Sequence, residues 1–335
     1  MQSASASTSA PVGHGVPKSH HFKFTVLKGY FQQSEDETND KEFDFRKSNF
    51  GLINRSYPSD ESGDTEESSA KQQWRRFEKY VRKLNDESAE NEYIKVLFLG
   101  RHGQGWHNVA ETKYGTAAWD CYWSMLDGAD GITWADANLT GVGEGQARDV
   151  HELWSLLLPD GIPSPETFYV SPLTRAIETA DLSFKGLELG PGNEYKPIIK
   201  ELLRETLGIH TCDRRSPATH LKTIFPHLAF EPGFAEDDPL WSAELREPNG
   251  ARRFRLSQLL DDIFTHDEGV VLSFTSHSGA IGSILEAVGH RKFALETGGV
   301  IPVLLRAEKV DGEREEPPKE PSEGPPKCTE PPVGS

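Results

Sequence analysis

The sequence predicts an α/β protein with a mainly parallel central sheet. Segments with the strand pattern alternate with segments that have helical periodicity. The segment YIKVLFL is apolar almost throughout, which is typical of a strand covered on both faces. We therefore expect helices on both sides of the sheet, in a three-layer α/β/α sandwich. The predicted strands of this sheet are 93–99, 166–170, 270–275 and 299–306.

The helices are predicted from apolar residues three and four positions apart. The segments 72–84 and 142–158 each carry one apolar face, and 174–184 and 279–288 follow predicted strands directly. The aromatic segment 21–31 alternates as a short strand would. Each helix that follows a strand fits a βαβ unit, in which a helix connects two parallel strands.

One domain is expected over residues 21–307, between two irregular ends. Residues 1–20 are rich in Ser, Ala and His and are predicted to be a flexible leader, and the acidic segment 59–69 a mobile loop. From Glu308 the chain has seven prolines and almost no large apolar residue. Such a segment cannot bury enough surface to offset its ordering entropy, so 308–335 is predicted to be a disordered Pro/Glu-rich tail.

The composition excludes some classes of partner. The net charge of −17 argues against binding to nucleic acid or to an anionic membrane, and no apolar run approaches membrane-spanning length. The three cysteines, Cys121, Cys212 and Cys328, lie far apart and show neither metal-ligand spacing nor a disulfide framework. We therefore expect no metal and no cofactor, a reducing compartment, and a cytoplasmic location.

Charged side chains follow three of the predicted strands. Arg101 and His102 come after the first, Arg175 after the second, and His277 after the third. The carboxyl ends of parallel strands meet at one edge of a sheet, so these four side chains should converge in one crevice. Arginine matches phosphate oxygens with a fork of donors, and histidine can donate a hydrogen bond or form a phosphohistidine. The pattern predicts a site for a phosphoryl group.

Four segments carry a family resemblance: LFLGRHGQGWHN, SPLTRAIETA, LLRETLG and FTSHSGAI. Together they resemble the signatures of the histidine phosphatase superfamily, in its phosphoglycerate-mutase-like branch. The resemblance covers roughly residues 93–306, and DANLTGVGEGQA resembles the stretch before the first helix of that branch.

The resemblance implies a role for each matching residue. His102 is the expected nucleophile, Glu205 the general acid, and His277 a donor to the phosphoryl oxygens. Glu201 competes with Glu205 by residue type, but the sequence context favours Glu205. The residues expected to bind the substrate are Arg101, Asn108, Arg175, Ser278 and Gly279.

The expected activity is that of a metal-independent phosphatase acting through a phosphohistidine on a small phosphorylated metabolite, a phosphomonoester or a diphosphate. A phosphoglycerate-type mutase and a non-catalytic phosphate-binding relative are the alternatives. The segment after LLRETLG lacks the mutases' pattern of basic residues, which favours the phosphatase. Arg214 and Arg215 either contact the substrate or form surface salt bridges. The oligomeric state is not predicted.

Residues 104–135 are predicted to form a helical or loop subdomain over the active site. Their aromatic residues either pack in its core or line a pocket for a bulky phosphate ester. His107 is interpreted as a wall or surface residue, with substrate contact as the alternative. The aromatic residues are Trp106, Trp119, Tyr122, Trp123 and Trp134.

Overall fold

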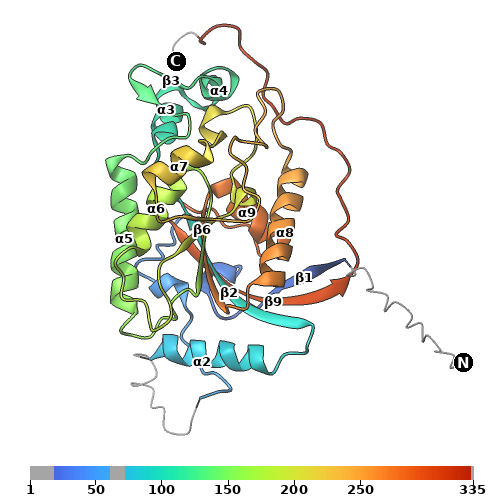
Figure 1. Ribbon diagram of the computed structural model, residues 1–335. Helices are drawn as coiled ribbons and strands as arrows, with labels where there is room; N and C mark the ends of the chain where they lie inside the picture. Colours follow the sequence, from blue (N-terminus) through green and yellow to red (C-terminus); the bar gives the residue numbers. More distant parts are fainter. Residues whose placement is uncertain (1–18, 61–71, 333–335) are drawn as a thin grey trace, which may run out of the picture.

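The computed structural model describes residues 19–60 and 72–332, and Figure 1 shows their arrangement. Most of the expected leader and of the expected acidic loop lies outside these residues. Among the described residues, none of the helices combines the length and the apolar character needed to cross a bilayer.

The central sheet has seven strands in the order β1-β9-β2-β8-β5-β6-β7. Five neighbouring strands, from β2 to β7, run parallel, while β9 runs antiparallel to both β2 and β1. The mainly parallel sheet expected from the sequence is therefore confirmed. The strands are β1 (His20–Val26), β2 (Glu92–Arg101), β5 (Thr167–Val170), β6 (Pro197–Ile199), β7 (Ala229–Phe230), β8 (Val271–Ser276) and β9 (Val300–Asp311), and a separate hairpin holds β3 (Gly128–Ala129) and β4 (Ile132–Thr133).

Helices cover both faces of the sheet, and α5 and α8 stand on opposite sides of it in Figure 1. Helices α2, α5 and α6 share one hydrophobic core with the sheet, and α8 and α9 share the other. The α-helices are α2 (Gln73–Asp86), α3 (Trp106–Tyr114), α4 (Thr116–Cys121), α5 (Gly141–Leu157), α6 (Thr174–Phe184), α7 (Ala218–Ile224), α8 (Asn249–His266) and α9 (Ser278–Ala287). Short 3-10 helices are Gln32–Ser34, Asn49–Gly51, Trp123–Met125, Glu201–Leu203 and Thr211–Asp213.

Strand β2 shows why its sequence is apolar almost throughout. Val96 and Phe98 point into the core under α2 and α5, whereas Leu97 and Leu99 point into the core under α8 and α9. Successive side chains of a strand face opposite sides, so a strand between two helical layers needs apolar residues at both. This double burial fixes the direction of the strand, and with it the place where Arg101 and His102 emerge.

A third hydrophobic cluster lies outside the two main cores. It joins α3, α4 and the β3–β4 hairpin around Trp134, which is fully buried, and Trp119, which is 3 % exposed. For these two residues, the structure supports core packing over the pocket alternative. Trp106 differs, because 41 % of its surface is exposed.

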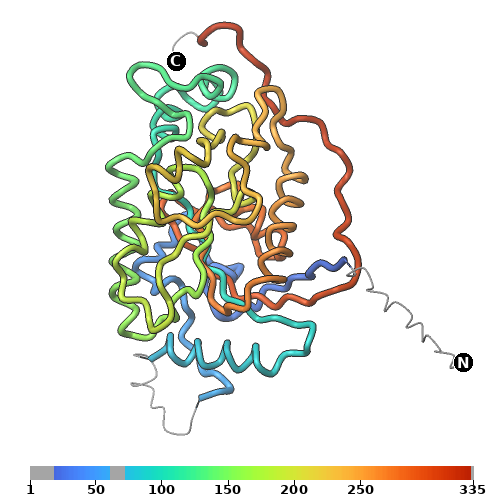
Figure 2. The backbone as a smooth tube through the Cα atoms, in the orientation of Figure 1, coloured from blue at the N-terminus to red at the C-terminus, as the bar shows by residue number. Residues whose placement is uncertain are grey.

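The C-terminal segment departs from the expected disorder. Strand β9 continues beyond Glu308, since β1 pairs with it as far as His20 opposite Asp311. Figure 2 shows the following chain running along one side of the molecule toward α4. There Ser322 accepts a hydrogen bond from the amide of Arg246, and Cys328 donates its amide to the carbonyl of Cys121. Contacts with residues far away in the sequence hold this segment in place. The amino-acid composition of the segment cannot reveal such contacts.

Cys121 and Cys328 form a disulfide, contrary to the expectation of no disulfide framework. They lie 207 residues apart, so no local spacing could signal the bond, and only the fold brings the C-terminal segment to α4. Because disulfides persist in oxidising environments, the cysteines no longer support the expectation of a reducing compartment. Cys212 is buried with a free thiol.

Replacing Cys328 with Ser should lower the free energy of unfolding by about 2–4 kcal/mol, because the open chain gains conformational entropy when it unfolds. Denaturant unfolding under non-reducing conditions measures this loss. A reductant should destabilise the unmodified protein by a similar amount and leave Cys328→Ser unchanged. Equal stability of both proteins without reductant would contradict the stabilising role of the disulfide.

Candidate active site

Three parallel strands bring the predicted residues to one edge of the sheet. Arg101, the last residue of β2, lies opposite Ser276, the last residue of β8. The amide of His102 continues this ladder by donating to the carbonyl of Ser276 at 2.9 Å, and Ser171 donates likewise to Thr275 at 3.0 Å. The predicted convergence of Arg101, His102, Arg175 and His277 follows from this register.

The imidazole of His102 is buried, with both ring nitrogens engaged. Nδ1 lies 2.7 Å from the carbonyl oxygen of Gly103, and Nε2 lies 3.3 Å from Nε of Arg175. A carbonyl oxygen only accepts, so Nδ1 carries the proton and Nε2 the lone pair. Burial lowers the pKa of His102 well below its ordinary value, and Arg175 and Arg101 lower it further. The ring is therefore neutral, with a lone pair on Nε2.

His277 lies beside His102, with 5.0 Å between the ring centroids. Its Nε2 is 2.7 Å from Oγ of Ser171, whereas its Nδ1 is enclosed without a hydrogen-bond partner among the described residues. Burial, followed by the charge of Arg175, lowers the pKa of His277 well below its ordinary value. Ser171 therefore orients a neutral second imidazole. No role was predicted for Ser171 from the sequence, although this residue directly follows the predicted strand 166–170.

Arg175 is fully buried and is held by the loop that follows Glu205. Its guanidinium donates to the carbonyl of Cys212 at 2.6 Å and to Oδ1 of Asp213 at 3.0 Å. The other oxygen of Asp213 accepts from Arg246 at 2.9 Å. Burial alone would raise the pKa of Asp213, but Arg246 and Arg175 outweigh it and hold that pKa below its ordinary value. Asp213 is thus an ionised bridge between two arginines, which sequence reasoning missed.

Arg101 and Asn108 are tied to the loops around His102. Arg101 donates through Nη1 to the carbonyl of Leu295 at 2.7 Å, and its buried Nε has no partner in the described part of the chain. Asn108 accepts a hydrogen bond from the amide of Gly105 at 3.0 Å and so caps the start of α3. Arg101 thus keeps one donor free, and Asn108 shapes the loop.

The carboxyl group of Glu205 lies beside the N-terminal end of α9. Its Oε2 accepts from the amide of Gly279 at 2.9 Å, and its Oε1 accepts from the amide of Thr206 at 2.9 Å. A Cβ at position 279 would collide with Oε1 of Glu205, so glycine allows this carboxyl group to reach the amide. Ser278, the first residue of α9, is exposed. Arg252 also borders this point and donates to Oγ1 of Thr206, a neighbour that the sequence did not reveal.

Other charged candidates have structural partners. Glu201 is bound by Arg204 at 3.0 Å and by Arg215 at 2.9 Å, so it supports the loop that carries Glu205. Arg215 is buried, and Arg214 pairs with Asp127 at 2.8 Å. For both arginines the structure supports salt bridging over substrate contact, although Arg215 does so in the interior.

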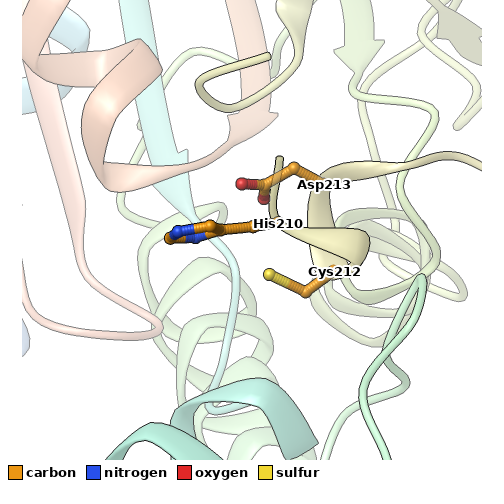
Figure 3. Close-up of side chains that lie close together, drawn as sticks. All are labelled: His210, Cys212 and Asp213. Atoms are coloured by element: carbon orange, nitrogen blue, oxygen red, sulfur yellow. The ribbon is translucent and has the colours of Figure 1, made fainter. Parts of the chain in front are cut away.

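Figure 3 shows three side chains with metal-ligand chemistry pointing into one space: His210, Cys212 and Asp213. We expected no such cluster from the cysteine spacing. Both carboxylate oxygens of Asp213, however, are already paired with arginine guanidinium groups. The guanidinium groups of Arg175 and Arg246 would repel a divalent metal ion at this position, so the three side chains do not fit a metal site. Asp213 and the carbonyl of Cys212 instead hold the guanidinium of Arg175 in place.

Comparisons with known proteins show which family the chain belongs to. A family model described as "Histidine phosphatase superfamily (branch 1)" matches residues 127–296. The "Probable phosphoglycerate mutase" of Arthroderma benhamiae is 50% identical over 88% of this chain and 87% of its own length. "Phosphomutase-like protein 3" of Candida albicans is 40% identical over 67% of this chain and 68% of its own length. Among solved structures, the ecdysone phosphate phosphatase of Bombix mori is 17% identical, with a TM-score of 0.39 over 68% of this chain and 95% of that chain.

The buried neutral histidines predict that stability falls as the pH drops below about 6.5, the ordinary pKa of histidine. Burial lowers the pKa of His210 to about 4, and His102 and His277 shift in the same direction. Between these values the unfolded chain binds protons that the folded protein excludes, so lower pH favours unfolding. Each such histidine should remove about 1.4 kcal/mol per pH unit in this window.

Denaturant unfolding at pH 7.0 and 5.5 tests this expectation. His210→Phe should reduce the pH slope by about one proton. His220→Phe is the control, because it replaces an exposed histidine by the same residue. A slope unaffected by His210→Phe would show that folding does not lower the pKa of His210.

Proposed function

Because the chain belongs to branch 1 of the histidine phosphatase superfamily, we propose that it is a metal-independent phosphatase that hydrolyses a small phosphorylated metabolite through a phosphohistidine. The lone pair on Nε2 of His102 carries this proposal. Burial keeps the ring unprotonated, and the contact with Gly103 leaves the attacking position on Nε2. A phosphoryl group bound beside Arg175 would lie next to this atom.

In the first step, Nε2 of His102 attacks phosphorus and the bond from phosphorus to the leaving oxygen breaks. Protonated Glu205 gives its proton to that oxygen, so the alcohol leaves neutral. Arg175 neutralises the phosphoryl charge, and the free donor on Arg101 adds a hydrogen bond. Ser171, donating to Nε2 of His277, would leave an N–H on Nδ1 for a phosphoryl oxygen.

In the second step, water attacks phosphorus from the side that the alcohol has left. Glu205, now ionised, takes a proton from this water, and the bond between phosphorus and Nε2 of His102 breaks. Inorganic phosphate leaves, and Glu205 is again protonated for the next cycle. The two steps consume one water and restore every protein group, as hydrolysis requires.

Mutase activity is the second candidate, because the names of the two fungal relatives indicate transfer. A phosphoglycerate mutase must also grip the carboxylate of its substrate. Two basic residues that follow Glu205 are engaged elsewhere: Arg215 with Glu201, and Arg214 with Asp127. This engagement favours hydrolysis. A non-catalytic relative is disfavoured because the nucleophile, the acid and the phosphate donors are all chemically competent.

The first test is phosphate release, without added metal, from a panel of phosphomonoesters and diphosphates at pH 5–8. We expect release by the unmodified protein and none by His102→Ala. His220→Phe is the matched control for replacing a histidine, because His220 is exposed on α7. Transfer between two positions of a phosphoglycerate, without phosphate release, would identify a mutase instead.

Replacing Glu205 with Gln should separate substrates by their leaving groups. An alkyl phosphate needs a proton on the departing oxygen, so its kcat should fall by about 100-fold or more. A p-nitrophenyl ester, whose leaving group is stable as an anion, should lose much less in the first step. Glu201→Gln is the control, since Glu201 is bound to arginines away from Gly279. Equal losses for both esters in the rate of the first step, measured as the initial burst of released alcohol or phenol, would reject Glu205 as the acid.

A further inference from the structure

The proposed mechanism leaves one buried group beside the nucleophile without a role. His107 lies in the first turn of α3, and its ring centroid is 5.3 Å from that of His102. The residue is only 9 % exposed, yet its ring makes no hydrogen bond to any residue that the structure describes. Burying an imidazole without a partner is unfavourable, so a protein that keeps one there uses it for packing or for a ligand.

The surroundings of the ring decide which nitrogen could meet a ligand. Nδ1 is enclosed and packs against Gly105, where a Cβ would come within 2.7 Å of it. The backbone of Gly105 therefore occupies the space in which a ligand would have to meet this atom. The residue's remaining exposed surface therefore leaves Nε2 as the nitrogen that can form a hydrogen bond outside the protein.

The protonation of the ring follows from its neighbours. Burial lowers the pKa of His107 well below its ordinary value, and Arg175, His102 and Arg101 reinforce this. A neutral imidazole has a single N–H, and an enclosed N–H without an acceptor costs about 1–3 kcal/mol. The proton therefore resides on Nε2, which makes this atom a hydrogen-bond donor.

We propose that His107 is a substrate-binding residue that donates a hydrogen bond from Nε2 to an oxygen of the phosphoryl group held at His102. The inference rests on the proposed function only in placing a phosphoryl group there. The other donors of the site belong to Arg101, Arg175 and His277, none of which lies in α3. His107 adds a donor from α3, so the inserted subdomain takes part in binding the anion.

The chain offers a matched pair of substitutions for the test. His107→Gln places an amide N–H near the position of Nε2, whereas His107→Asn places it near Nδ1, which faces Gly105. Both side chains are polar and smaller than that of histidine. Comparing them separates the position of the donor from the polarity of the residue, and the comparison remains usable if His107→Phe does not fold.

The probes are inorganic phosphate and vanadate, measured by direct binding and by inhibition of ester hydrolysis. His107→Asn and His107→Phe should weaken phosphate binding about 10- to 100-fold, the effect of losing one hydrogen bond to a charged group. His107→Gln should recover most of this loss, and His220→Phe should bind as the unmodified protein does. Thermal unfolding of each variant reports separately on packing.

Equal phosphate affinity in the Gln and Asn variants would overturn the proposal, as would unchanged affinity in a folded His107→Phe. Binding is measured independently of turnover, so it also separates this proposal from the proposed function. A protein that hydrolyses no ester but loses phosphate affinity in His107→Asn would reject the phosphatase and support the role of His107.

Discussion

Burial and neighbouring charge together keep the imidazole of His102 neutral, with a lone pair on Nε2. Arg175 and Arg101 disfavour a proton on the imidazole, and the carbonyl of Gly103 retains the remaining N–H on Nδ1. A histidine exposed to water would be partly protonated near its ordinary pKa, and its tautomer would be free. The fold thus determines which nitrogen can react, and the other groups of the site are placed relative to that atom.

Placing a fully buried arginine beside this histidine requires compensation elsewhere. Asp213 supplies it for Arg175 and is shared with Arg246, while Asp238 and Glu201 compensate the fully buried Arg204. An unpaired buried charge would cost several kcal/mol, so buried ion pairs hold the loop from Arg204 to Arg215 in place. The same loop carries the acid candidate. The charged residues of this loop therefore stabilise the geometry of the site more than they contact the substrate.

The pattern of apolar and polar residues predicted the features of the fold that depend on neighbours along the chain. The two-sided burial of β2 appears as an apolar run, and the strand ends located His102, Arg175 and His277. Long-range partners explain what was missed. Cys121 meets Cys328 across 207 residues, and β9 lengthens because β1 pairs with it. Asp213 and Ser171 have ordinary sequence contexts, and their roles depend on which buried side chain each one touches.

The central claim is that phosphate passes through Nε2 of His102, and trapping the intermediate tests it most directly. Protein mixed with a phosphomonoester would be quenched rapidly in alkali, in which a phosphoramidate survives, and digested for peptide mass spectrometry. Phosphate found on His102 in the unmodified protein, increased in Glu205→Gln if the second step slows more than the first, would agree with this account. Steady phosphate release with no phosphorylated His102, or with phosphate on another residue, would contradict it.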